Sequence, residues 1–134
     1  SKGVKDNTEI LEQGLRLAIG TIINANAKPI IIVNVPEFPD DLARCIIFKS
    51  TEDCAIPKAE VADRQSGLIN ILNTLTAEFP MLIVLDFTNN LCDESYCFSG
   101  FNGRPYYFDS NHLNYNASRE LGMRYIKTNS NPFK

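Results

Sequence analysis

A helical spacing of apolar residues opens this chain of 134 residues. Over residues 10–24, apolar side chains recur every three or four positions at Leu11, Leu15, Ala18, Ile19 and Ile22. Asp6, Asn7 and Thr8 offer caps before this segment, and Glu9 follows near the positive end of the helix dipole. The pattern predicts an amphipathic helix that ends before Pro29.

Two short apolar runs have no such period. Residues 30–35 read Ile-Ile-Ile-Val-Asn-Val, and residues 81–87 read Met-Leu-Ile-Val-Leu-Asp-Phe. Strands that are exposed on one face alternate apolar and polar residues, whereas continuous runs are typical of strands covered on both faces. We therefore expect two buried strands.

Two further helices are predicted downstream of the first strand. The first opens at Pro57, ends before Pro80 and has one apolar face made of Val61, Leu68, Leu72, Leu75 and Phe79. The second follows an Asn114 cap, with Leu113, Ala117 and Leu121 at helical spacing, and fades into a polar tail at residues 128–134. Residues 37–53 and 88–111 read as long loops.

The order helix, strand, helix, strand, helix predicts parallel strands with helices on both faces, a three-layer α/β/α domain over residues 1–134. Two strands are few for such a sheet. Either further strands lie in the loops or the chain is the C-terminal part of a larger α/β domain. The opening Ser1-Lys2-Gly3, without a starting Met or a signal-peptide pattern, favours the second interpretation.

The composition of the chain excludes several classes of function. The apolar fraction is 44% and the charged fraction 22%, as in ordinary globular proteins. The net charge of -3 argues against nucleic acid or an anionic membrane as partner, because clustered Lys and Arg hold such surfaces. No apolar run reaches the roughly 20 residues of a membrane span. No Gly-rich phosphate loop follows either strand, so we expect no cofactor, and a flavodoxin-like domain is disfavoured.

The four cysteines form two local pairs, Cys45 with Cys54 and Cys92 with Cys97. Neither spacing is that of a zinc knuckle, and one histidine cannot complete two ligand sets, so we expect no metal. Disulfides within each pair fit best and would indicate a periplasmic or extracellular compartment. Four cysteines nevertheless allow three pairings, and four reduced thiols in a cytosolic protein remain an alternative.

The single histidine, His112, lies three residues after Asp109, in the loop beyond the second strand. Ligands of open α/β sheets gather at the carboxyl ends of the strands. A histidine that accepts a proton from a hydroxyl needs a partner that fixes its tautomer, and a carboxylate does so. The pair is a candidate catalytic site, and a helix cap or an ordinary polar loop is the alternative.

Residues 103–114 read Gly-Arg-Pro-Tyr-Tyr-Phe-Asp-Ser-Asn-His-Leu-Asn and follow the loop with Cys92 and Cys97. This block resembles the last motif of SGNH hydrolases and acyltransferases, and most closely the extracytoplasmic SGNH domain fused to membrane acyltransferases of family three. There it reads approximately Gly-x-Pro-Leu-Tyr-x-Asp-x-x-His-Leu-Ser, so Tyr106 replaces Leu and Asn114 replaces Ser. Residues 33–36 are similar to a core strand of the same domains.

The resemblance implies that His112 is the general base and Asp109 its orienting acid in an O-acyltransferase or esterase of cell-surface glycans. A membrane acyltransferase domain would supply the acyl donor, a glycan would be the acceptor, and the chain would be tethered to a membrane protein. Arg104 and Tyr106 are weaker candidates for substrate binding, because a solvated arginine and an aromatic loop core are common.

The family's Gly-Asp-Ser nucleophile motif is not visible, and no serine lies in a strand-turn-helix elbow. The serines are Ser1, Ser50, Ser66, Ser95, Ser99, Ser110, Ser118 and Ser130. We therefore expect the chain to carry the Asp-His half of a Ser-His-Asp site and to be inactive alone. A non-catalytic extracytoplasmic binding or docking domain is the alternative.

Overall fold

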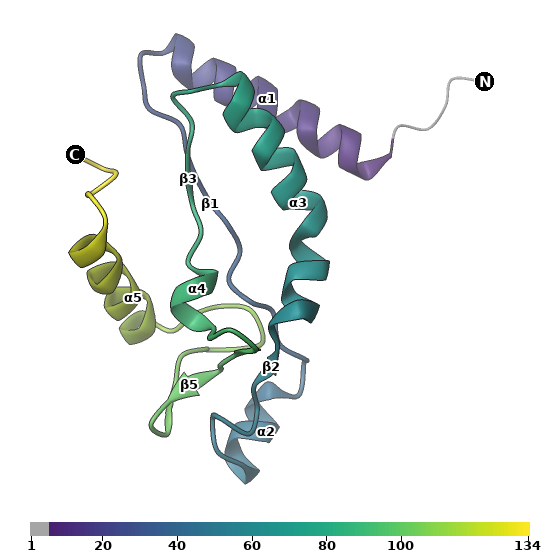
Figure 1. Ribbon diagram of the computed structural model, residues 1–134, viewed down its shortest axis with the longest axis vertical. Helices are drawn as coiled ribbons and strands as arrows, with labels where there is room; N and C mark the ends of the chain where they lie inside the picture. The colour runs from purple at the N-terminus through teal and green to yellow at the C-terminus, as the bar shows by residue number, and fades with distance from the viewer. Residues whose placement is uncertain (1–5) are drawn as a thin grey trace. The chain divides into compact units, whose positions relative to one another are not determined.

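A computed structural model describes residues 6–134 (Figure 1). The Ser1-Lys2-Gly3 opening, on which the prediction of a fragment partly rested, lies outside the described residues. The chain divides into two compact units. The first takes the residues through Ile32 together with Arg64–Leu85, and the second takes Val33–Asp63 together with Asp86–Lys134.

The first unit pairs two helices with two strands. It contains α1 (Asn7–Asn24), β1 (Ile30–Ile32), most of α3 (Lys58–Glu78) and β3 (Ile83–Leu85). Its core is formed by residues of both helices and of the segment before β3, namely Ile19, Ile71, Leu75 and Leu82. Arg16 links the helices, because its Nε donates to Glu78 Oε2 over 2.8 Å while its Nη2 contacts Glu12. The predicted helices are confirmed.

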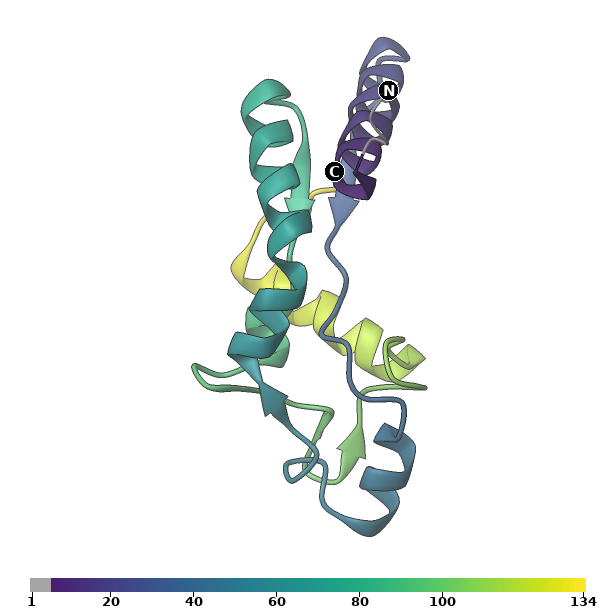
Figure 2. The same ribbon diagram turned by 90° about the vertical axis from the view of Figure 1, so that its right-hand side faces the viewer.

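β1 and β3 form a parallel pair in which Ile31 lies opposite Val84, so the predicted parallel arrangement is confirmed. Both views show α1 and α3 on the same face of this pair (Figures 1 and 2). Ile31 and Val84 pack into the core on that face. On the other face Ile32 is 57% exposed, whereas Leu85, which lies opposite it, is 2% exposed, so a helix layer on that face stays a prediction. Both strands are also shorter than the apolar runs that predicted them.

The second unit contains three helices and two antiparallel ladders. Its elements are α2 (Leu42–Phe48), β2 (Ile56–Pro57), the start of α3, α4 (Thr88–Leu91), β4 (Tyr96–Cys97), β5 (Gly100–Phe101), β6 (Arg104–Pro105) and α5 (Tyr115–Thr128). β2 pairs with β4, and β5 pairs with β6. The two predicted loops therefore hold regular structure, in elements too short to show a periodic pattern. None of these strands joins β1 and β3 within the described residues.

Disulfides support the small core of the second unit. Cys45 is bonded to Cys54 and Cys92 to Cys97, as the local pairing predicted. Cys54 and Cys97 are themselves core residues, packed with Phe38, Leu42, Ile56, Val61 and Tyr107. Covalent links are typical of domains whose apolar core is too small to hold long loops by packing alone.

The β5–β6 hairpin requires two glycines for different reasons. Asn102 and Gly103 form its two-residue turn, and both have positive φ, +50° and +72°. Asn-Gly is the preferred pair for such a turn. Gly100 is instead required by a close approach, because a Cβ there would lie 2.8 Å from Thr51 Cγ2 and 2.9 Å from Pro105 Cα.

We predict that Gly100→Ala lowers the free energy of unfolding by about 1–3 kcal/mol, because backbone atoms must move to admit the methyl group. The matched control is Gly122→Ala in α5, where a Cβ would meet nothing within 4 Å. That change should stabilise the protein by about 0.5–1 kcal/mol. Urea unfolding of both variants measures the difference, and equal effects would show that the close packing at Gly100 is wrong.

The disulfides should contribute measurably to stability. Their sequence separations are 9 and 5 residues, for which loop closure predicts about 2–3 kcal/mol each. Cys92→Ala combined with Cys97→Ala should lower the free energy of unfolding by that amount. The unreduced, denatured protein should show no thiol that reacts with a chromogenic disulfide, and four reactive thiols would contradict both pairings.

Candidate active site

Asp109 and His112 lie in one tight turn. Asp109 Oδ1 accepts hydrogen bonds from the backbone N–H of Asn111 over 2.9 Å and of His112 over 2.7 Å. The Phe108 N–H donates to the His112 carbonyl over 2.7 Å and closes the turn. An aspartate that binds the backbone two and three residues ahead builds such turns, so the sequence Asp-Ser-Asn-His favours this conformation locally.

The turn brings the two side chains into direct contact. His112 Nδ1 lies 2.7 Å from Asp109 Oδ2, and the side chains are 74% and 43% exposed respectively. The same carboxylate therefore holds both the backbone and the imidazole of His112. The structure thus brings together the two residues that the sequence selected as a pair.

The hydrogen bonds set the ionisation of the pair. The Asn111 N–H, and after it the His112 side chain, hold the pKa of the Asp109 carboxyl below its ordinary value. The carboxylate is then ionised at neutral pH and can only accept, so Nδ1 of a neutral imidazole must carry the proton. Nε2 is left with its lone pair, and it has no hydrogen-bond partner among residues 6–134. This is the tautomer that a general base requires.

A buried tyrosine fixes the turn to the core of the second unit. The Tyr107 hydroxyl donates to the Pro36 carbonyl over 2.9 Å, and its ring meets Phe38 edge to face at 4.9 Å. Burial raises the pKa of Tyr107, so this hydroxyl keeps its proton. From the same segment, the Phe38 N–H donates to the Ser110 carbonyl over 2.8 Å. Sequence reasoning missed the role of residues 36–38, because nothing local marks two segments 71 positions apart as partners.

Asn114 connects the turn to α5, as predicted for a cap. Its Oδ1 accepts from the Ala117 N–H over 2.9 Å, and its Nδ2 donates to the Pro105 carbonyl over 2.6 Å. The Asn114 N–H also donates to the Tyr106 carbonyl over 2.8 Å. One side chain therefore begins the helix and holds the strand that precedes the turn.

Arg104 and Tyr106, the weaker candidates for substrate binding, lie together at a different place from the Asp109–His112 pair. Both line an open groove of about 760 Å³ between the β5–β6 hairpin and α5. Neither Asp109 nor His112 lines this groove. The structure thus places the four predicted site residues as two pairs.

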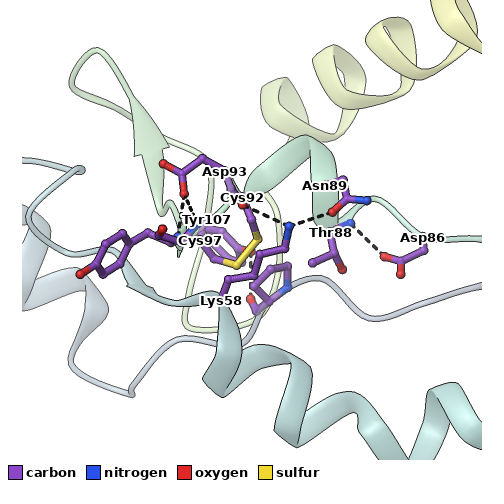
Figure 3. The surroundings of a disulfide bond; sticks show 11 residues. Lys58, Asp86, Thr88, Asn89, Cys92, Asp93, Cys97 and Tyr107 are labelled. Carbon is purple, nitrogen blue, oxygen red and sulfur yellow. Dashed lines mark hydrogen bonds between the residues drawn. A yellow bond between two sulfur atoms is a disulfide. The ribbon is translucent and has the colours of Figure 1, made fainter.

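The cysteine loop beside this region is held by polar contacts (Figure 3). Lys58 Nζ donates to Asn89 Oδ1 over 3.0 Å and to the Asp93 carbonyl over 3.1 Å. Asp93 Oδ1 accepts from the N–H groups of Tyr96 and Ser95, and these bonds hold the pKa of Asp93 below its ordinary value. The loop is therefore braced by the Cys92–Cys97 disulfide and by Lys58 together.

Within the described residues of the second unit, no serine is hydrogen-bonded to the His112 side chain. Ser99 is fully buried and donates from Oγ to the Thr51 carbonyl over 3.0 Å. Ser110 lies within the turn itself, where its carbonyl accepts from the Phe38 N–H. Within residues 6–134, the only hydrogen-bond partner of the His112 ring is Asp109.

Comparison with protein families identifies the chain. The family model of the SGNH domain fused to AT3 domains matches residues 2–127. The chain belongs to this family, which associates it with acyltransferases and ester hydrolases. Neither the curated proteins nor the solved structures include a match. No helix within residues 6–134 has the length and hydrophobicity needed to cross a membrane.

The coupling of the pair can be measured on Asp109. His112→Gln removes the imidazole, so the pKa of the Asp109 carboxyl should rise toward its ordinary value, while the backbone N–H bonds keep it from rising fully. Carboxyl-carbon NMR titration measures this shift. The Asp93 carboxyl, whose partners are other N–H groups, is the internal control and should not change. An unchanged Asp109 would contradict the contact.

The lowered pKa of Asp109 also determines how its contribution to folding stability changes with pH. Because the folded-state pKa of Asp109 is depressed, its stabilising contribution is present above the unfolded-state pKa of about 3.9. That contribution is lost as the pH falls through the folded-state value. The loss should be smaller in His112→Gln than in the wild type.

Proposed function

We propose that this chain supplies the Asp-His half of a Ser-His-Asp site in an O-acyltransferase or esterase that acts on cell-surface glycans. The observation that carries the proposal is the 2.7 Å contact between His112 Nδ1 and Asp109 Oδ2, which leaves Nε2 without a hydrogen-bond partner among residues 6–134. Family membership supports the reaction class.

In the proposed reaction, His112 Nε2 accepts the proton of a serine hydroxyl as the serine oxygen attacks an acyl carbonyl. Asp109 stabilises the imidazolium that forms. The tetrahedral intermediate collapses, His112 returns the proton to the departing alcohol, and an acyl-serine remains. A sugar hydroxyl or water then attacks this ester and loses its proton to His112, which returns the proton to the serine oxygen as the acyl–serine bond breaks. Transfer and hydrolysis thus differ only in the acceptor.

The serine in this proposal comes from outside these residues, in a segment preceding them or on another chain. Two features support a larger three-layer domain: the parallel pair has only two strands within the described residues, and Ile32 is exposed on its second face. A membrane acyltransferase domain is the proposed source of the acyl group, since the family is fused to such domains. The disulfides support a periplasmic or extracellular location.

One observation favours a second function. Among residues 6–134, no serine is hydrogen-bonded to the His112 ring. An SGNH domain that has lost its nucleophile would keep the disulfides, the turn and the capped helix while serving only to bind a glycan or a partner. The two functions differ in whether removal of the imidazole changes glycan acylation.

The test uses the complete polypeptide that the gene encodes, expressed in its own cell. His112→Ala should reduce ester-linked acyl groups on the surface glycan to background, and Asp109→Asn should reduce the acylation rate by about 10³ to 10⁴-fold, because the tautomer is no longer fixed. Ester content released by mild alkali is the measurement. Arg44→Gln, an exposed residue of α2, is the control.

Ester content that stays at the wild-type level in His112→Ala would reject the catalytic proposal and favour the binding domain. A complementary assay uses the 134 residues alone. They should not turn over p-nitrophenyl acetate or react with a serine-directed fluorophosphonate. Turnover that depends on His112 would show that an activated serine is present in this chain.

A further inference from the structure

The groove between the β5–β6 hairpin and α5 has the size and chemistry of a ligand site. It encloses about 760 Å³ and is lined by Phe101, Arg104, Tyr106, Asn116, Glu120 and Arg124, among others. A second hollow of about 410 Å³ continues along α5, shares Asn116, Glu120 and Arg124 with the first, and adds Arg119 and Lys127. Small-molecule sites commonly enclose about 300–1,000 Å³.

The charged groups that line the groove and the second hollow are predominantly cationic. Arg104, Arg119 and Lys127 are exposed, and none of them forms an ion pair within residues 6–134. Arg124 is paired with Glu120, the only acid that lines either hollow. Three unpaired cations therefore remain, on a chain whose net charge is -3.

Two further acids, Glu52 and Asp93, line a third hollow, which shares Phe101, Tyr106 and Arg124 with the groove. Both acids are already hydrogen-bonded. Glu52 accepts from the Asn102 N–H over 3.2 Å and from Thr51 Oγ1 over 2.9 Å, and Asp93 accepts from two backbone N–H groups. Their carboxylates stabilise local turns.

Aromatic and amide side chains complete the lining. The Phe101 ring is 57% exposed, and Tyr106 lines both the groove and the third hollow. An exposed ring offers an apolar face to the C–H face of a sugar, and a tyrosine adds a polar tip. The Asn116 side chain is exposed and can donate to and accept from hydroxyl groups. Rings, amides and cations together match a saccharide that carries carboxylates.

We propose that this hairpin–helix groove, together with the second hollow that continues it along α5, binds a short acidic saccharide, with Phe101 and Tyr106 against sugar rings and Arg104, Arg119 and Lys127 against carboxylates. The proposal goes beyond the acyl-transfer function and stands without it. Three cations on an otherwise acidic protein suit a ligand of a few charges, in keeping with the exclusion of an extended polyanion surface.

The experiment titrates the isotope-labelled chain with tetragalacturonate while backbone amide NMR shifts are followed. The shifts should map to the hairpin and to α5. The matched ligand is the fully methyl-esterified tetrasaccharide, which keeps the rings and removes the charges, and it should bind at least about fivefold more weakly. Raising the salt concentration should remove this difference between the ligands.

Variants of the protein separate the contribution of the cationic side chains to saccharide binding from that of the aromatic ring. Arg104→Gln, Arg119→Gln and Lys127→Gln should each weaken tetragalacturonate binding by about two- to fivefold, and the triple variant by tenfold or more. Phe101→Ala should weaken both saccharides to the same degree. Arg44→Gln, an exposed cation of α2 that lines none of these hollows, is the matched control and should bind as the wild type.

Three results would overturn the proposal. These are the absence of shifts with either saccharide, equal affinity for the acid and its ester, and equally tight binding of a thymidine tetranucleotide at the same residues. The triple variant should keep the wild-type pKa of the Asp109 carboxyl, so failure of this proposal is distinguishable from failure of the catalytic one.

Discussion

The hydrogen bond from the buried Tyr107 hydroxyl to the Pro36 carbonyl is the contact on which the Asp-His turn depends. A turn of five residues cannot hold an exposed imidazole in place by itself. Tyr107 immediately precedes the turn, and the Phe38 N–H holds Ser110 at its centre. The core of the second unit therefore fixes the backbone on both sides of Asp109, and the carboxylate then needs only its own hydrogen bonds to orient His112.

A small number of specific side-chain contacts also holds the rest of the second unit together. Its helices α2 and α4 are short and its strands have two residues each, so neither helix propensity nor a sheet can organise it. The second unit is organised instead by its disulfides, by the Asn114 cap and by the Lys58 contacts. Each of these devices is specific to a few side chains.

The sequence predicted correctly those features that rest on a long periodic pattern or on residues close together in the chain. The three long helices, the parallel pairing of β1 with β3, the Asn114 cap and the disulfide partners all follow from periodicity or short spacing. α2 was missed because its exposed Ile47 and Phe48 hide any amphipathic period within seven residues. The β5–β6 hairpin was missed although Asn102-Gly103 marks it, because the turn was included in one long loop. The Pro36–Tyr107 contact has no local signature, and only the folded chain could reveal it.

The exposure of the Asp-His pair bears on how it would work. An ion pair in water gains little, since solvent screens the charges, whereas the imidazolium of an acyl-transfer step must be stabilised strongly. The His112 side chain is 74% exposed in the described chain. The pair therefore has the tautomer that a general base requires, but the carboxylate would stabilise an imidazolium only weakly, because water screens its charge. Under our proposal, the segment that brings the serine would also cover His112 and exclude water from Nε2. The catalytic strength of the carboxylate would then arise only when the nucleophile is in place.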